Sequence, residues 1–213
     1  MFNLQYLLTL IPAALIAISF HEMCHGFAAY LLGDRTAQYN GRLSLNPLSH
    51  IDPLGFLCMV LFRFGWAKPV PVNPRNFKNP KVGMALTAFA GPLSNFVLAF
   101  AALFAYVAIV LSSPGRFLMA LATFLMILGE LSVGLGIFNL LPIPPLDGSK
   151  IMFMFLPNKA VRWFYNYEGY IRLALLLGLY FGLFDSVIGL GRTAMLNGIY
   201  SVIFKMCMAV GLI

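Results

Sequence analysis

A long apolar segment with a metal-binding pattern inside it constrains this chain more than any other feature. Residues 4–32 are largely apolar and contain His21-Glu22-Met23-Cys24-His25. A helix needs ~20 apolar residues to cross a bilayer, so this run can span one. On a helix, His21 and His25 share a face and can bind one metal, while Glu22 can take a proton from a bound water. Buried ionisable groups are costly, so we expect a metal site there; a polar cluster satisfied by neighbouring helices is the alternative.

Further apolar runs along the chain are also long enough to predict membrane spans. They occupy residues 82–112, 117–141, 163–184 and 190–213, and 61% of the 213 residues are hydrophobic. Only 10% are charged, whereas soluble domains average ~25%. We therefore predict an all-α polytopic membrane protein with about five transmembrane helices in a single domain over 1–213. We also expect reduced thiols, and a first helix that is kept rather than removed as a signal peptide.

The connection over residues 33–81 is basic and rich in proline. Its apolar run 56–62 is too short to cross a bilayer, which indicates a re-entrant segment on the cytoplasmic side. Prolines within residues 66–74 exclude a helix and favour an edge strand or an extended lip at the membrane surface, carrying Val70 and Val72. His50 lies in the same connection, where it could gate or line an entrance, or act only as a local hydrogen-bond partner.

The distribution of basic residues predicts the orientation in the membrane. The net charge is +7, but no basic face with interleaved aromatic residues is evident, so we expect no nucleic-acid partner. Residues 35–81 and 150–162 hold most of the arginines and lysines. Because such residues collect in cytoplasmic loops, we expect the N-terminus outside. The end of the first helix that carries the His-Glu-x-x-His zinc motif of residues 21–25 would then lie towards the cytoplasm.

The two histidines need a further ligand, because a catalytic zinc usually has three protein ligands and a water. Asp147 stands out, since the prolines of residues 142–145 break the third span at membrane depth, where freed backbone tends to line a water-filled cavity. Asp147 could instead cap the helix that follows. The other candidates are one histidine and two acids: His50, Glu130 and Glu168. Of these, we expect Glu130 to be paired across helices.

Three elements together resemble the site-2 protease family of intramembrane zinc metalloproteases, peptidase family M50. They are residues 21–25, Ala90-Gly91-Pro92 with Asn95, and residues 139–150 with their Leu-Asp-Gly element. The likeness is to short prokaryotic members without a PDZ domain, although a helix before the zinc motif is missing. The resemblance implies Zn²⁺ as cofactor, Asp147 as third ligand and Glu22 as catalytic base.

The resemblance also implies roles in substrate binding. Asn139 would contact the substrate backbone or the oxyanion, although it could instead cap the helix C-terminus; Asn95 would lie near the active site. We expect an intramembrane endopeptidase of the prokaryotic inner membrane that cleaves unwound transmembrane segments of membrane-anchored proteins. A catalytically silent relative that binds helices or carries metal is the alternative. A metal transporter is less favoured, because it would need polar groups spaced across the bilayer.

Overall fold

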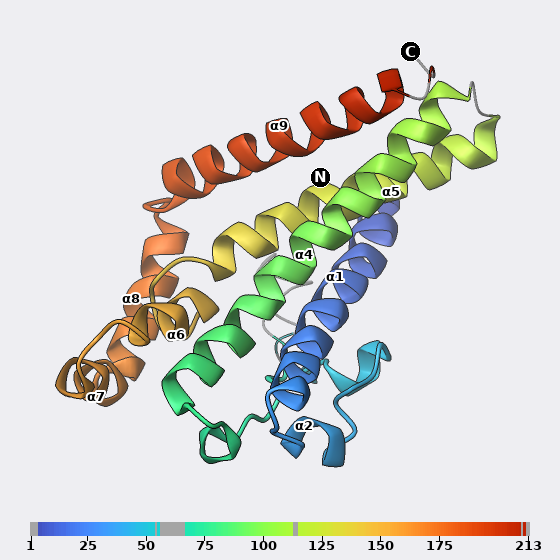
Figure 1. The fold of residues 1–213 in the computed structure, drawn as a ribbon. Coiled ribbons are helices and arrows are strands. Elements are labelled where there is room, and N and C mark those ends of the chain that lie inside the picture. Colours follow the sequence, from blue (N-terminus) through green and yellow to red (C-terminus); the bar gives the residue numbers. More distant parts are fainter. Residues whose placement is uncertain (1–3, 54, 56–66, 113–114, 210, 212–213) are drawn as a thin grey trace. The chain divides into compact units, whose positions relative to one another are not determined.

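The computed structural model describes residues 4–53, 55, 67–112, 115–209 and 211, which form helices joined by turns (Figure 1). The helices and short 3-10 turns are α1 (Leu4–Leu31), α2 (Thr36–Tyr39), η1 (Pro47–Ser49), η2 (Pro74–Asn76), α4 (Pro80–Leu111), α5 (Arg116–Asn139), α6 (Asp147–Phe153), α7 (Asn158–Asn166), α8 (Glu168–Tyr180) and α9 (Asp185–Ala209). Among the described residues, four helices are long and apolar enough to cross a membrane: Leu8–Leu31 of α1, α4, α5 and α9. This confirms the predicted all-α polytopic membrane fold.

One predicted span differs from the structure. Residues 163–184 are divided at Tyr167, which ends α7 with φ −106° and ψ 11°. The following helix α8 has 13 residues, too few for the ~20 that span a bilayer. Asn166 and Glu168 flank the break, and polar groups at this point interrupt the apolar run. A total of five transmembrane helices therefore stays a prediction.

The ends of the long helices follow from local chemistry. Gly33 ends α1 with φ +103°, a conformation that favours glycine. Its N–H donates to the Tyr30 carbonyl at 3.0 Å and the Asp34 N–H donates to Ala29 at 2.9 Å, which is a Schellman cap. α4 begins at Pro80 and continues through Pro92. α5 ends at Asn139, because the prolines that follow cannot continue it.

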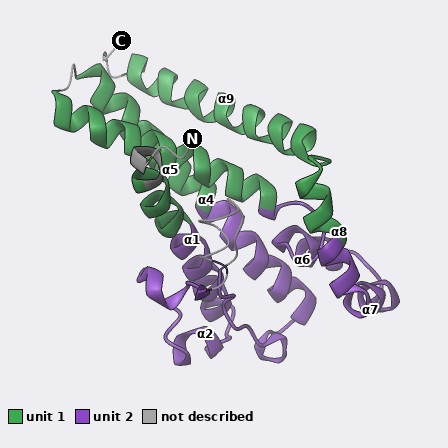
Figure 2. Ribbon diagram, turned by 180° about the vertical axis from the view of Figure 1, so that it is seen from behind, with its two compact units in different colours: residues 1–17, 95–138, 174–213 green, residues 18–94, 139–173 purple. Residues whose placement is uncertain are grey.

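The chain forms two compact units (Figure 2). Unit 1 comprises residues 1–17, 95–138 and 174–213. Its α4, α5 and α9 pack around Leu103, Val133 and Ile203, and small residues such as Ala99 and Gly129 let these helices approach closely. Such packing matters in a membrane, where helices gain little from the hydrophobic effect. Glu130 accepts from Arg192 at 2.6 Å across α5 and α9, as predicted for an acid within a span.

Unit 2 comprises residues 18–94 and 139–173 and contains the zinc motif. Within it, Lys81 at the start of α4 donates to the Leu156 carbonyl at 2.7 Å, beyond the end of α6. On another side, Gly26 of α1 packs closely, because an added Cβ would lie 3.1 Å from Ala37 and 3.4 Å from Val70. These contacts hold α6 and the extended segment within the same compact unit as the two histidines.

Of the two forms predicted for residues 66–74, the described residues 67–73 adopt the extended segment and not the edge strand. Among the described residues, its pairing is limited to one antiparallel bridge between Ile51 and Ala67 and a 2.9 Å bond from Lys68 N–H to the His50 carbonyl. The N–H groups of Val70 and Asn73 instead donate to side-chain carboxylates, which replaces the ladder of a sheet. The predicted re-entrant run 56–62 lies outside the described residues.

Candidate metal centre

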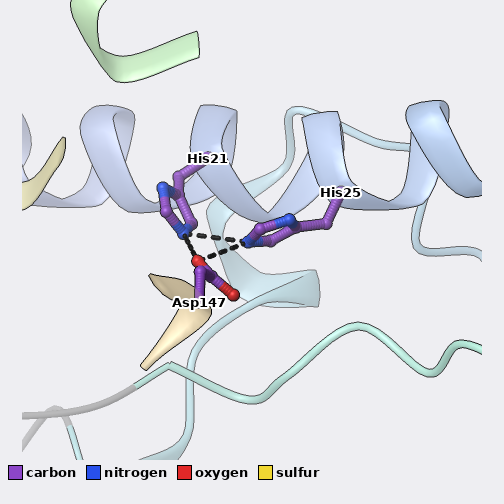
Figure 3. Close-up of side chains that lie close together, drawn as sticks. All are labelled: His21, His25 and Asp147. Atoms are coloured by element: carbon purple, nitrogen blue, oxygen red, sulfur yellow. Dashed lines mark hydrogen bonds and ion pairs between the residues drawn. The ribbon is translucent and has the colours of Figure 1, made fainter. Parts of the chain in front are cut away.

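α1 and α6 bring three candidate ligands together (Figure 3). His21 and His25 project from one face of α1, and their Nε2 atoms lie 3.0 Å apart. Oδ2 of Asp147 lies 3.1 Å from Nε2 of His21 and 3.0 Å from Nε2 of His25. All three residues are buried, and among the described residues they are the one cluster of histidines, cysteines and acids that could hold a metal.

The broken backbone after α5 delivers Asp147 to this point. The chain turns through bonds from Ile143 N–H to Leu141 and from Leu146 N–H to Ile143, at 2.8 and 2.9 Å. The N-cap of α6 is Leu146, so Asp147 is the first residue of the helix and does not act as its cap. Gly148 lies so close to the preceding turn that a Cβ there would be 2.2 Å from the Leu140 carbonyl oxygen. The Leu-Asp-Gly element therefore permits a tight turn beside the candidate ligand.

Two further groups orient the candidate ligands. Nδ1 of His25 lies 2.7 Å from the carbonyl oxygen of Thr87 in α4, and a donated N–H there leaves Nε2 with its lone pair free for a metal. Lys150 donates to Oδ1 of Asp147 at 3.3 Å, on the oxygen that faces away from the histidines. One carboxylate oxygen is thus directed at the cluster while the other is held by an ammonium group.

The environment keeps Asp147 ionised, as a metal ligand must be. Burial would raise the pKa of this carboxyl group, but the charge of His25 and hydrogen bonds from His21 and His25 hold the pKa well below its usual range. The charge of Lys150 acts in the same direction. The carboxylate is therefore ionised at neutral pH.

Glu22 lies next to His21 on α1 and is half-buried. Its Oε2 accepts a hydrogen bond from the backbone N–H of Val70 at 3.2 Å. This contact joins the acid of the zinc motif to the extended segment that follows the bridge at Ala67. This bond anchors one of the two carboxylate oxygens of Glu22.

The remaining predicted residues are placed as follows. His50 is buried and donates from Nε2 to the Ser44 carbonyl at 2.7 Å, so its observed role is local and a gating role stays a prediction. Glu168 pairs with Arg172 at 3.2 Å and is not in the cluster. Asn139 is half-buried in unit 2, and Asn95 is fully buried in unit 1. Their substrate roles, and that of Val72, stay predictions.

Comparison with known proteins identifies the family. Residues 109–179 match the model of peptidase family M50. YwhC of Bacillus subtilis (strain 168), which is named a putative zinc metalloprotease, is 42% identical over 156 residues, 70% of this chain and 71% of YwhC. The chain belongs to peptidase family M50, the site-2 protease family. It is therefore related to membrane zinc proteases, as predicted, and zinc is the cofactor that the cluster has to fit.

Two further relatives are also named putative zinc metalloproteases. Rip2 of Mycolicibacterium smegmatis is 31% identical over 139 residues, 63% of this chain and 52% of Rip2. A protein of Methanocaldococcus jannaschii is 29% identical over 137 residues, 62% of this chain and 63% of that protein. No solved structure matches the chain.

The cluster fits zinc in donor type and in size. Two imidazole nitrogens and a carboxylate oxygen are common zinc donors, and Zn–ligand bonds of ~2.0–2.2 Å in a tetrahedron separate the donors by about 3.3–3.6 Å. The separations in the cluster, 3.0 to 3.1 Å, fall a few tenths of an ångström short of that range. Gly91 of α4 leaves room for the rings, since a Cβ there would lie 2.4 Å from Nε2 of His25.

Sequence reasoning missed three contributors to this centre. The Thr87 carbonyl carries no sequence signal, because every residue has one. Lys150 follows Asp147 by one helical turn, a spacing that could have suggested the contact. Gly91 lies within the Ala-Gly-Pro element quoted for the family resemblance, but only its packing against the imidazoles explains why a glycine occurs there.

Proposed function

We propose that this protein is an intramembrane zinc endopeptidase that cleaves transmembrane segments of membrane-anchored proteins. One observation carries the proposal: two imidazoles of a helix long and apolar enough to cross a membrane meet a carboxylate from a distant part of the chain, all three are buried, and Glu22 lies beside them. Ionisable groups at such depth usually serve a function. Membership of family M50 and the names of the relatives support the same reaction class.

In this mechanism His21, His25 and Asp147 hold the zinc. When bound, zinc supplies Lewis-acid activation of a water and of the scissile carbonyl. Glu22 accepts the proton of the attacking water and passes it to the leaving amine. The Val70 N–H holds Oε2 of Glu22, which fixes the direction of the carboxylate and leaves Oε1 to carry the proton.

The substrate has to be extended locally, because a helical segment hides its carbonyl groups in its own hydrogen bonds. We propose that the segment with Val70 and Val72, or the broken backbone of residues 142–145, pairs with the unwound substrate as an added strand. Asn139 is the last residue of α5 and would donate to the oxyanion. Asn95 would help to bind the substrate.

The distribution of charge supports an orientation in the prokaryotic inner membrane. Arginines and lysines gather in residues 35–81 and 150–162, so these segments would face the cytoplasm together with the active site, and the N-terminus would lie outside. Substrates would be transmembrane regulators released by regulated intramembrane proteolysis, remnants of signal peptides, or membrane proteins under quality control.

The test is a Glu22→Gln variant purified and reconstituted beside the wild type. Glutamine keeps an acceptor for the Val70 N–H but cannot take a proton, so cleavage of a transmembrane substrate should fall by about 10²- to 10⁴-fold while zinc stays bound. Glu168→Gln removes an acid from an exposed pair and serves as the control. Cleavage that survives Glu22→Gln excludes the mechanism. A zinc-loaded wild type that cleaves no substrate favours the silent, helix-binding relative.

A further inference from the structure

Asp34 is a fully buried carboxylate just beyond the C-terminal end of the zinc-motif helix. The Schellman cap at Gly33 fixes its position, because the Asp34 N–H is bonded to the Ala29 carbonyl at 2.9 Å. Aspartate is rarely buried without partners, since removing a charge from water is costly. The partners of this side chain therefore indicate what the buried charge is for.

Four hydrogen bonds surround the carboxylate. Oδ1 accepts from the backbone N–H of Thr36 at 3.1 Å, from its hydroxyl at 2.5 Å and from the side-chain amide of Asn76 at 2.7 Å. Oδ2 accepts from the backbone N–H of Asn73 at 2.7 Å. No lysine, arginine or histidine among the described residues forms an ion pair with Asp34. The charge is thus held by donors, half of which belong to the turn at residues 73–76.

A second carboxylate of the same helix holds the other end of this segment. Glu22 accepts from the Val70 N–H at 3.2 Å, and Val70 packs against the Gly26 position of α1. The extended chain from Val70 to Asn73 is therefore bonded to α1 at the zinc motif and again at the helix end. Hereafter we call residues 70–76 the strap.

We propose that Asp34 is a positioning residue for proteolysis: it holds the strap at the height along α1 at which Val70 engages Glu22 and at which the strap receives the unwound substrate. The proposal rests on the proposed function, because the strap matters for catalysis only if substrate binds there. Asp34 lies outside the zinc cluster, so its loss should leave the metal bound and should impair substrate binding more than the chemical step.

The variant Asp34→Asn tests this. The amide of asparagine is similar in size, but its NH₂ group would face the N–H donors that now bond to a carboxylate oxygen. The hydrogen bonds that join Asp34 to the strap, which we call the latch, are therefore weakened. Trypsin should then cleave after Arg75 or Lys78 at least about tenfold faster than in the wild type, because a hydrogen bond to a charged group is worth ~1.5 kcal/mol or more. KM for a transmembrane substrate should rise by a similar factor, with a smaller fall in kcat and with zinc content within about twofold of the wild type.

Two controls keep the result interpretable. Asp185→Asn makes the same change at an exposed acid of unit 1 and should alter neither trypsin cleavage nor KM. Asn76→Ala removes a single donor and should give a smaller effect in the same direction. If the strap of Asp34→Asn stays protected from trypsin, Asp34 does not hold the strap and the proposal is wrong. If trypsin cleaves the strap faster but KM is unchanged, the strap has no role in substrate binding. If the wild type cleaves no substrate but Asp34→Asn still makes the strap sensitive to trypsin, the proposed function is rejected, whereas the structural role of Asp34 in holding the strap is retained.

Discussion

Replacing Gly91 with alanine should disable the metal centre without touching any candidate ligand. Gly91 lies in α4, where its missing side chain leaves space for both imidazoles. A Cβ built there would lie 2.4 Å from Nε2 and Cε1 of His25 and 2.6 Å from Cε1 of His21. Non-bonded carbon atoms prefer ~3.5 Å or more, so either the rings or the helix backbone would have to move by about 1 Å.

That displacement is large compared with what a metal site tolerates. Metal–ligand distances vary by about ±0.2 Å in well-formed sites, and a misplacement of ~1 Å at a catalytic centre costs about 10²-fold in rate. Alanine favours a helix over glycine by ~1 kcal/mol, so the helix itself should not be weakened. We therefore expect zinc affinity and cleavage of Gly91→Ala each to fall by about 10²-fold or more.

The assay is zinc content after dialysis against a graded series of chelator concentrations, with cleavage measured on the same samples. Gly134→Ala is the matched control, because this helical glycine has open space around its Cβ position. It should behave as the wild type. If Gly91→Ala retains zinc affinity and activity within about twofold of the wild type, α4 does not pack against the imidazoles as described, and the reasoning is wrong.

Three further predictions follow from contacts around the centre and the strap. Lys150→Met removes the donor to Oδ1 of Asp147, so zinc affinity should fall by about 10- to 100-fold in chelator competition, with no loss of strap protection; unchanged affinity would contradict the contact. Burial raises the pKa of Asp34, but the bonds from Thr36, Asn73 and Asn76 outweigh this effect and lower it. A carboxyl group whose pKa is lowered in the folded protein stabilises the fold fully above the unfolded pKa of ~3.9 and loses that stabilisation as the pH falls through the folded pKa. The protection factors of the strap amides, which are exchange rates corrected for their intrinsic pH dependence, should therefore be constant from pH 7 to 5 and fall only below about pH 4; a fall at pH 6 would contradict this. Glu130→Gln and Arg192→Gln break one partly exposed pair, so both should lower the melting temperature slightly and the double variant should be no worse than either.

The membrane class and the shared helical face of two candidate zinc ligands could be predicted from the sequence alone. Apolar runs of spanning length predicted α1, α4, α5 and α9 to within a few residues at most ends. The spacing of His21 and His25 predicted their common face, because helical periodicity is a property of neighbouring residues. The division between α7 and α8 was missed, since Trp163 and the tyrosines around it resemble an apolar span although they belong to an amphipathic helix.

How groups that are far apart in the sequence come together depends on the tertiary structure. Residue spacing left Asp147 among several possible ligands, and the turn through residues 140–146 placed its carboxylate 126 positions along the chain from His21 and within 3.1 Å of it. The Thr87 carbonyl, the space at Gly91 and the donors around Asp34 likewise belong to other parts of the chain. Helical periodicity can be read from neighbouring residues, whereas these contacts depend on how the helices pack. Backbone N–H and C=O groups are present in every residue, so only the packed structure shows which of them contact the site.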